Sequence, residues 1–322
     1  MVEESSRRQE DLDLSVVIPV FNEEENLLEL YGKLKEVLER TGRSYEIIFV
    51  DDGSTDRSLE ILKSIHEIDR RVKVIRFRKN FGQTAVLSAG FDHAKGKIIV
   101  TMDADLQNDP EDIPLLLGKI EEGYDVVSGW RADRKDPISK KIPSRISNWL
   151  ASKLTGLKLH DFGCTLKAYR KEIIKNVRLY GDHHRYIPAL ASWQGAKIAE
   201  VKVRHHPRKH GKSKYGFKRL LRGFLDLIVV KFLVDYSTRP MHFFGILGLL
   251  LILGGFILGL SLVIERFLFH ISLSDRPLLL LAVLLIIVGL QFLMIGLIGE
   301  LVIRTYFETH KKPTYVIEEV IE

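Results

Sequence analysis

Ile98-Ile99-Val100-Thr101-Met102-Asp103-Ala104-Asp105-Leu106-Gln107 joins a short apolar run to two carboxylates one residue apart. Residues i and i+2 of an extended chain point to the same side, so Asp103 and Asp105 can converge on one hard cation. Carboxylate oxygens suit Mg²⁺ or Mn²⁺, which bridge phosphate oxygens. An open α/β sheet places its ligand at the carboxyl ends of its strands, where this pair lies. The stretch predicts a buried strand that ends at a metal and phosphate site, although Asp-x-Asp also occurs in ordinary turns.

Apolar runs on both sides of this strand predict further strands, over residues 14–20, 45–50, 72–77 and 125–130. Leucine and isoleucine residues at helical spacing lie between the first three of them. Alternation of helices with strands that are apolar on both faces predicts an α/β fold with a mostly parallel sheet. No Gly-x-Gly-x-x-Gly or Walker A sequence follows any strand, so we expect metal and side chains to hold the phosphates.

Composition points to anionic partners. The 322 residues carry a net charge of +6, which favours phosphate-bearing ligands. The one cysteine, Cys164, excludes an intramolecular disulfide. Residues 1–13 are charged and polar, predict a flexible N-terminal tail, and do not have the pattern of a signal peptide.

Two long uncharged runs, residues 243–264 and 278–299, follow the soluble part of the chain. Each exceeds the roughly 20 residues that a helix needs to cross a bilayer, so we predict two transmembrane helices. More Lys and Arg residues flank this pair than lie in the loop between its helices. The positive-inside bias therefore places the soluble domain and both termini in the cytoplasm.

The predicted organisation is a soluble domain over residues 14–214, an amphipathic juxtamembrane helix over 215–240, a transmembrane region over 241–303 and a cytoplasmic tail over 304–322. A second amphipathic stretch, residues 145–154, could lie on the membrane or pack against the sheet. Small residues of the first apolar run allow close helix packing, so a homo-oligomer is possible. Those residues are Gly248, Gly254, Gly255 and Gly259.

Four motifs together identify a family. They read Val-Val-Ile-Pro-Val-Phe-Asn-Glu at 16–23, Val-Asp-Asp-Gly-Ser at 50–54, Met-Asp-Ala-Asp-Leu-Gln at 102–107 and Asp-Phe-Gly-Cys at 161–164. In this order they resemble family 2 glycosyltransferases of the Rossmann-like GT-A fold, and above all the polyprenyl-phosphate glycosyltransferases. That group includes dolichol-phosphate mannose synthase, bacterial undecaprenyl-phosphate glucosyltransferase and the aminoarabinose-type transferase of lipid A modification. The resemblance covers nearly the whole chain, and two spans point to the bacterial-type subgroup.

The resemblance implies roles for individual donor-side residues. Asp103, Asp105 and Gln107 would hold the metal that bridges the diphosphate of a nucleotide sugar, although Gln107 could be a plain turn residue. Pro19, Glu23 and Asp52 match positions that line the base and ribose. Asp52 could instead cap a helix. Arg131 matches an arginine that contacts phosphate, and its alternative is a solvated surface charge.

Acceptor-side residues follow from charge and from the same resemblance. The basic segment 204–215 could close over phosphate, and we select Lys212 and Lys214 within it; Arg145 is the candidate for the acceptor phosphate. A phosphate acceptor is already an anion near neutral pH, because its second pKa should resemble the ~6 of phosphoserine. No dedicated base is therefore required. Asp161 is the candidate if one exists, and it could equally orient the acceptor or hold sugar hydroxyls.

These features predict a membrane-bound, inverting, Mg²⁺- or Mn²⁺-dependent glycosyltransferase. It would move one sugar, from a UDP-sugar such as UDP-glucose, to a polyprenyl phosphate on the cytoplasmic leaflet; membrane lipids are expected partners and nucleic acid is not. The alternatives are a GDP-mannose-dependent dolichyl-phosphate mannose synthase and a processive polysaccharide synthase, whose Gln-x-x-Arg-Trp motif is missing. A non-enzymatic membrane anchor and a transporter are weaker alternatives, since the carboxylates are intact and the spans carry no central ionisable residue.

Overall fold

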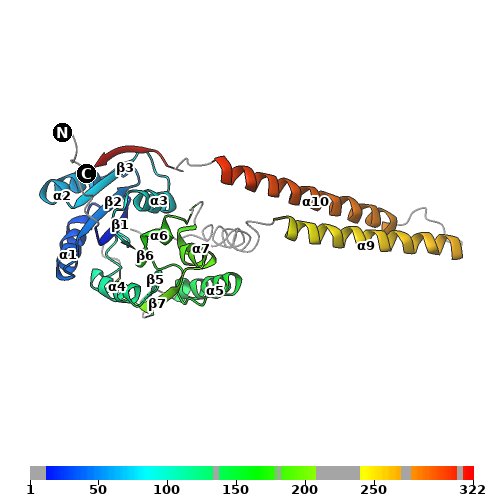
Figure 1. The fold of residues 1–322 in the computed structure, drawn as a ribbon, viewed down its shortest axis with the longest axis horizontal. Helices are drawn as coiled ribbons and strands as arrows, with labels where there is room; N and C mark the ends of the chain where they lie inside the picture. Colours follow the sequence, from blue (N-terminus) through cyan, green and yellow to red (C-terminus); the bar gives the residue numbers. More distant parts are fainter. Residues whose placement is uncertain are drawn as a thin grey trace, which may run out of the picture. The chain divides into compact units, whose positions relative to one another are not determined.

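The computed structural model describes residues 12–132, 138–177, 179, 183–207, 240–269, 277–309 and 315–322. The chain forms two compact units. The first comprises Met1–Lys231 together with Pro313–Glu322, and the second comprises Phe232–Lys312. In the part of the chain that is described, the first unit contains the sheet and the second contains two long helices (Figure 1).

The first unit is built on an eight-stranded sheet in the order β7-β5-β6-β4-β1-β2-β3-β8. Its strands are β1 (Leu14–Val20), β2 (Tyr45–Asp51), β3 (Val72–Phe77), β4 (Ile98–Thr101), β5 (Val126–Trp130), β6 (Lys167–Arg170), β7 (Ile198–Lys202) and β8 (Ile317–Ile321). Neighbouring strands are parallel except at β6, which is antiparallel to β4 and β5, and at β8, which is antiparallel to β3. The α/β fold with a mostly parallel sheet is therefore confirmed.

Helices cover both faces of this sheet (Figure 1). The helices of the first unit are α1 (Leu27–Arg40), α2 (Ser58–Ile68), α3 (Gln83–His93), α4 (Ile113–Glu121), α5 (Ile138–Thr155), α6 (Lys171–Ile174) and α7 (Ile187–Trp193). Val16 and Ile18 of β1 belong to the core that α1, α2 and α4 close. Val17 faces α3, where a Cβ on Gly90 would lie 2.2 Å from its side chain. Burial of successive residues on opposite faces explains why β1 is apolar without alternation.

Strand direction brings five chain segments to one edge of the sheet. β1, β2 and β4 run parallel, so residues 21–26, 52–56 and 102–107 all follow carboxyl ends at this edge. β5 is antiparallel to β6, which is antiparallel to β4, so β5 also ends there and β6 begins there. Arg131 and the segment before β6 therefore arrive beside Asp103, although long stretches of sequence separate them.

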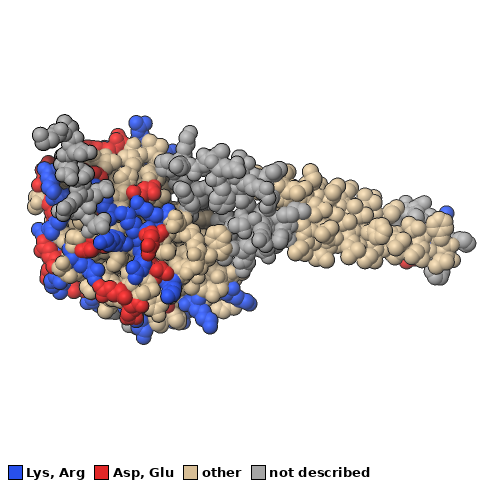
Figure 2. Space-filling view, in the orientation of Figure 1, with Lys and Arg blue, Asp and Glu red and all other residues tan. Residues whose placement is uncertain are grey.

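The second unit consists of α9 (Pro240–Phe269) and α10 (Pro277–Thr309). Phe244–Leu268 and Pro277–Gly299 are long and apolar enough to cross a membrane, and only 17% and 11% of their most apolar windows are buried within the protein. Figure 2 shows uncharged residues along almost the whole visible surface of these helices, in contrast with the charged surface of the sheet unit. If these were core helices of a soluble protein, most of their apolar side chains would be buried rather than exposed.

Glycine brings α9 and α10 into close contact. A Cβ on Gly248 would lie 2.6 Å from the carbonyl oxygen of Gly289, and one on Gly255 would lie 2.7 Å from that of Ala282. Two of the glycines expected to mediate oligomerisation thus serve a contact within the chain. Gly254 has no neighbouring atom within 4 Å of the position that a Cβ would take, and a homo-oligomer stays a prediction.

The expected C-terminal tail, residues 304–322, requires correction. α10 continues to Thr309, and Ile317–Ile321 forms β8, which pairs with β3 in the register Val74↔Ile321. The ring of Tyr315 stacks on Phe77 at 5.1 Å between centroids. Its hydroxyl donates a hydrogen bond of 2.8 Å to Asp92. The end of the chain is therefore part of the sheet unit, because pairing and ring burial hold it at the edge that β3 would otherwise expose.

The second amphipathic stretch, residues 145–154, lies within α5. Trp149 on this helix is 62% exposed, and the ammonium group of Lys153 lies 5.2 Å from the centre of its ring. Contact of α5 with a membrane stays a prediction. The juxtamembrane helix expected over residues 215–240 lies almost entirely outside the described residues.

Replacing Tyr315 tests how firmly β8 is anchored. We expect Tyr315→Ala to lower the free energy of unfolding of the sheet unit by about 3 kcal/mol, since a buried aromatic ring is removed. Tyr315→Phe should lose about 1 kcal/mol, because only the hydrogen bond to Asp92 is lost. Denaturant unfolding of the detergent-solubilised chain, followed by tryptophan fluorescence, measures both. Equal losses in the two variants would show that the ring stack contributes nothing.

Candidate active site

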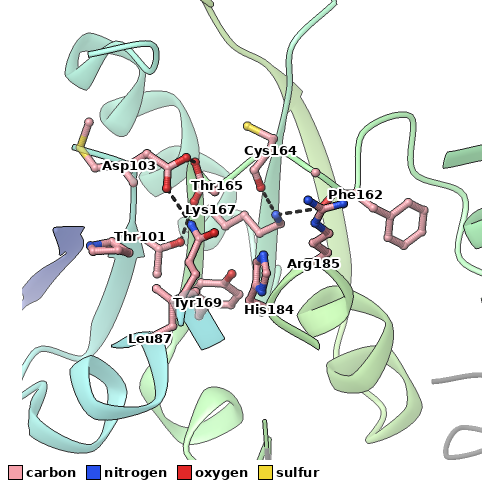
Figure 3. Close-up of a pocket in the computed structure, with 14 residues that line it drawn as sticks. Leu87, Thr101, Asp103, Phe162, Cys164, Thr165, Lys167, Tyr169, His184 and Arg185 are labelled. Atoms are coloured by element: carbon pink, nitrogen blue, oxygen red, sulfur yellow. Dashed lines mark hydrogen bonds between the residues drawn. The ribbon is translucent and has the colours of Figure 1, made fainter. Parts of the chain in front are cut away.

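Two carboxylates follow the carboxyl end of β4. Asp103 accepts hydrogen bonds from the side-chain amide of Gln83 and the hydroxyl of Thr165, each at 2.8 Å (Figure 3). Asp105 is 6% exposed, and one of its oxygens accepts the backbone N–H of Gln107 at 3.2 Å. Burial, followed by the negative charge of Asp105, raises the pKa of Asp103 to about 6. Two like charges held close in a poorly solvated site favour a cation between them.

The carboxylates of Asp103 and Asp105 suit a divalent metal ion that also binds a substrate. Among the described residues, no group of three His, Cys, Asp or Glu side chains is arranged to hold a metal ion. Mg²⁺ is commonly held by one or two carboxylates, with substrate phosphates and water completing its coordination. Asp103 and Asp105 supply that number of carboxylates. Their oxygen atoms suit Mg²⁺ or Mn²⁺ better than softer metals.

The turn after the carboxylates is conformationally strained. Leu106 has a φ of 59°, a left-handed conformation that a residue with a Cβ rarely adopts. Its side chain is 5% exposed and belongs to the hydrophobic core. Core packing therefore holds the turn in place, and the turn fixes the direction of the neighbouring Asp105.

Gln107, the third expected metal ligand, contacts a different segment. The side-chain amide of Gln107 donates to the backbone carbonyl oxygen of His206 at 3.3 Å. The backbone carbonyl oxygen of Gln107 accepts the backbone N–H of His206 at 2.9 Å. A bridge between Asn108 and His205 continues this pairing. Gln107 thus joins the carboxylate turn to the segment that follows β7, and metal ligation by Gln107 stays a prediction.

Arg131 and Asp161 form a paired unit that the sequence did not predict. The Arg131 guanidinium donates from Nε to Oδ2 at 2.7 Å and from Nη2 to Oδ1 at 3.0 Å. The backbone N–H of Gly163 donates to the same Oδ1 at 3.1 Å. A two-pronged contact of this kind fixes the plane of the guanidinium as well as its position. Asp161 therefore orients Arg131 in this structure, and its action as a base stays a prediction.

The residues expected around the nucleotide occupy the same edge of the sheet in different roles. Pro19 lines a hollow beside Asp103. Glu23 accepts a hydrogen bond from the side chain of Asn26 at 2.6 Å. Asp52 is 4% exposed, and its two oxygens accept the backbone N–H groups of Phe81 at 2.6 Å and Gly82 at 2.9 Å. Asp52 thus holds the loop before α3 without capping a helix, since both N–H groups precede the first residue of α3, and contact with a base stays a prediction.

A buried lysine is the main residue that the sequence analysis missed. Lys167 is 3% exposed, and its ammonium group donates to the carbonyl oxygens of Phe162, at 3.3 Å, and Cys164 (Figure 3). Burial lowers its pKa, while the carboxylates of Asp161 and Asp103 act to raise it. A lysine between Leu166 and Ala168 was the available sequence signal, because a lysine is seldom buried without a role.

The hollow beside Asp103 is partly open, and the roughly 300 Å³ of space between its walls includes bulk solvent. Its wall includes Lys167, Thr165, His184 and Arg185 (Figure 3). His184 Nδ1 lies 2.9 Å from the hydroxyl of Thr84 on α3, which fixes the ring. The Asp103 carboxylate and the cationic side chains of Lys167 and Arg185 line the same hollow, an arrangement that suits a metal-bound phosphate ligand.

Of the three acceptor-side candidates, Arg145 belongs to the part of the chain that the structure describes. Arg145 is exposed on α5 and does not line the hollow. Lys212 and Lys214 lie outside the described residues. All three stay predictions.

Comparison with known proteins agrees with this site. Residues 15–178 match the profile of glycosyl transferase family 2. The chain is 40% identical over 318 residues to a dodecaprenyl-phosphate galacturonate synthase from Rhizobium johnstonii, covering 97% of this chain and 94% of that protein. It is 38% identical over 310 residues to an undecaprenyl-phosphate 4-deoxy-4-formamido-L-arabinose transferase from Salmonella paratyphi B, covering 96% and 93%.

Solved structures share the fold at lower identity. The glucosyl-3-phosphoglycerate synthase of Mycobacterium tuberculosis, in complex with Mn²⁺, UDP and glucosyl-3-phosphoglycerate, superimposes with a TM-score of 0.54 at 18% identity. The match covers 69% of this chain and 80% of that one. This likeness supports the fold of the sheet unit.

Neutralising Asp103 should stabilise the metal-free protein in a pH-dependent way. The folded-state pKa of about 6 exceeds the ordinary 3.8, so the stability of the folded state falls as pH rises through this window. We expect Asp103→Asn to raise the thermal midpoint by roughly 3 °C at pH 8, where the charge cost is complete, and to have little effect at pH 4.

Thermal unfolding in detergent, with and without Mn²⁺, measures this effect. Mn²⁺ should stabilise the original protein and not Asp103→Asn. Glu67→Gln, at an exposed carboxylate, is the matched control. A midpoint that falls in Asp103→Asn at pH 8 would contradict the charge repulsion.

Proposed function

The chain belongs to glycosyl transferase family 2, and from that membership we propose that it moves a single sugar from a nucleotide donor to a polyprenyl phosphate, with inversion at the anomeric carbon. The observation that carries the proposal is the likeness, over more than nine-tenths of their length, to two transferases that act on polyprenyl phosphates. Their names agree on the class of lipid and differ in the sugar. The match includes the two apolar helices, so it extends beyond the catalytic domain.

The site chemistry supports transfer from a nucleotide sugar. A divalent cation held by Asp103 and Asp105 would neutralise charge on the departing diphosphate. Arg131 supplies a fixed cation at the same edge of the sheet, where it can bind and orient a phosphate. Lys167 holds the backbone carbonyls of residues 162 and 164, and so keeps the segment after Asp161 in place.

Attack by the acceptor requires positioning more than deprotonation. The second pKa of a polyprenyl phosphate should resemble the ~6 of phosphoserine, so this acceptor is an anion at neutral pH. Alignment of an anionic oxygen with the anomeric carbon can supply a large part of the rate enhancement. This assignment removes the need for Asp161 as a base and leaves it the role of orienting Arg131.

For the donor, we propose a UDP-sugar such as UDP-glucose. The Mycobacterium tuberculosis synthase that shares the fold binds UDP with Mn²⁺, and the Asp-Phe-Gly-Cys segment favours the bacterial-type subgroup. The two relatives act with galacturonate and with 4-deoxy-4-formamido-L-arabinose, so both sugars belong in any donor comparison.

We further propose that the catalytic domain and the C-terminus lie on the cytoplasmic side. The pairing of β8 with β3 brings the chain back to the sheet unit after α10. Two spans are the smallest number that return a chain to its starting side of a membrane. Lys and Arg residues are more frequent outside this pair of helices than in the loop between them, which favours the cytoplasm for the sheet unit.

A donor panel tests the function. Purified protein in detergent would be incubated with Mn²⁺ or Mg²⁺, undecaprenyl phosphate and one radiolabelled donor at a time. The donors are UDP-glucose, UDP-N-acetylglucosamine, UDP-galacturonate, the nucleotide-linked formamido-arabinose and GDP-mannose. We expect one donor to give a metal-dependent product that extracts into organic solvent.

Asp105→Ala is the matched negative variant, and we expect its rate to fall by at least about 1000-fold, a loss as large as that of a strong electrostatic contact, without loss of folding. A long water-soluble glycan in place of a lipid product would favour a polysaccharide synthase. Full activity of Asp105→Ala in metal-free buffer would rule out the metal site.

A further inference from the structure

Residues 130–131, at the end of β5, lie beside residues 160–161, and each residue of one pair contacts one residue of the other. Arg131 is paired with Asp161, and the residues that precede them are paired as well. The ring of Trp130 stacks on that of His160, with 4.2 Å between centroids and 15° between planes. Two covalent bonds and two side-chain contacts thus close a ring of four residues, which we call the clasp: Trp130, Arg131, His160 and Asp161.

A carboxylate from β7 fastens one side of the clasp. Oε1 of Glu200 accepts the backbone N–H of His160 at 2.9 Å and that of Asp161 at 3.0 Å. Oε2 of Glu200 lies 2.7 Å from Nδ1 of the His160 ring. β7 also reaches the other side of the clasp, where the ammonium group of Lys202 lies 5.2 Å from the centre of the Trp130 ring.

The contacts of Glu200 are those of a positioning group. Its side chain is 11% exposed, so it is largely removed from water, and backbone groups provide two of its three donors. Residues 160–166 have no helix or strand to satisfy their backbone, so these N–H groups depend on a side chain. Glu200 does not line the hollow beside Asp103. The hydrogen bonds described above for Glu200 all go to His160 and Asp161, so the geometry suits an effect through those two residues.

We infer that Glu200 is a positioning residue for sugar transfer: by holding the backbone of His160 and Asp161, it sets the Arg131–Asp161 pair in the orientation that transfer requires. This inference rests on the proposed function. A displacement of about 1 Å at a reacting centre can cost on the order of 100-fold in rate, so a residue outside the hollow can control turnover.

The effect of replacing Glu200 on turnover should depend on whether the new side chain can still accept hydrogen bonds from the backbone N–H groups of His160 and Asp161. Glu200→Ala removes the acceptor of two backbone N–H groups, those of His160 and Asp161, and we expect kcat/KM to fall by about 10-fold to 100-fold. Glu200→Gln retains an oxygen for those N–H groups and should keep most of the activity. Glu172→Gln, at an exposed carboxylate of the same unit, is the control and should match the original protein.

A double-mutant cycle separates positioning from general loss of structure. If Glu200 acts through Arg131, Glu200→Ala should cost less than about twofold once Arg131 is already alanine, because residues of one network do not contribute additively. A full, independent loss in that background would overturn the inference. Equal losses in Glu200→Ala and Glu200→Gln would also overturn it, since retained acceptance of the backbone N–H groups would then not matter.

Hydrogen exchange at the backbone of residues 157–166, read by mass spectrometry, tests the clasp without any substrate. The original protein should protect the N–H groups of His160 and Asp161, and Glu200→Ala should release them while the core strands stay protected. Unchanged exchange in Glu200→Ala would overturn the inference even if the donor panel succeeds. Failure of every donor would reject the proposed function, and the exchange experiment would still decide whether Glu200 holds the clasp.

Discussion

Negative charge held at the carboxyl end of a buried strand is the constraint on which the rest of this site depends. β4 lies between β1 and β6, and its end brings Asp103 and Asp105 into a poorly solvated position where burial and mutual repulsion raise the pKa of Asp103 to about 6. Cations from other segments surround the pair, with Lys167 on β6 and Arg131 after β5. The two carboxylates can also bind a divalent cation that shares its coordination with a diphosphate.

The sequence predicted those parts of the fold whose signal is local. The five apolar runs became β1 to β5 because strands buried on both faces must be apolar throughout. The Asp103 and Asp105 pair could be placed at the sheet edge because a strand's end is visible in the sequence. β8 was missed because its partner, β3, lies more than 230 residues earlier, and a short alternating segment beside a helix gives little sign of its pairing.

Contacts between distant segments were the least predictable part of the site. Arg131 and Asp161 were each selected, but for separate roles, and only the antiparallel insertion of β6 shows why they meet. Asp52 was selected for a base contact, whereas its two oxygens accept backbone N–H groups of the loop before α3. Lys167 escaped notice because composition rules place lysine on the surface, and only burial among carbonyls and carboxylates reveals it.

The most direct test of the metal-site account is the coupling between a divalent cation and the nucleoside diphosphate released in the reaction. The affinity for Mn²⁺, measured by the resonance signal of the free ion, would be determined with and without the diphosphate in the original protein and in Asp105→Asn. If both carboxylates and the diphosphate share one cation, each ligand should strengthen binding of the other by the same factor, and Asp105→Asn should remove that coupling. Equal affinity for the diphosphate with and without Mn²⁺ in the original protein would contradict the account.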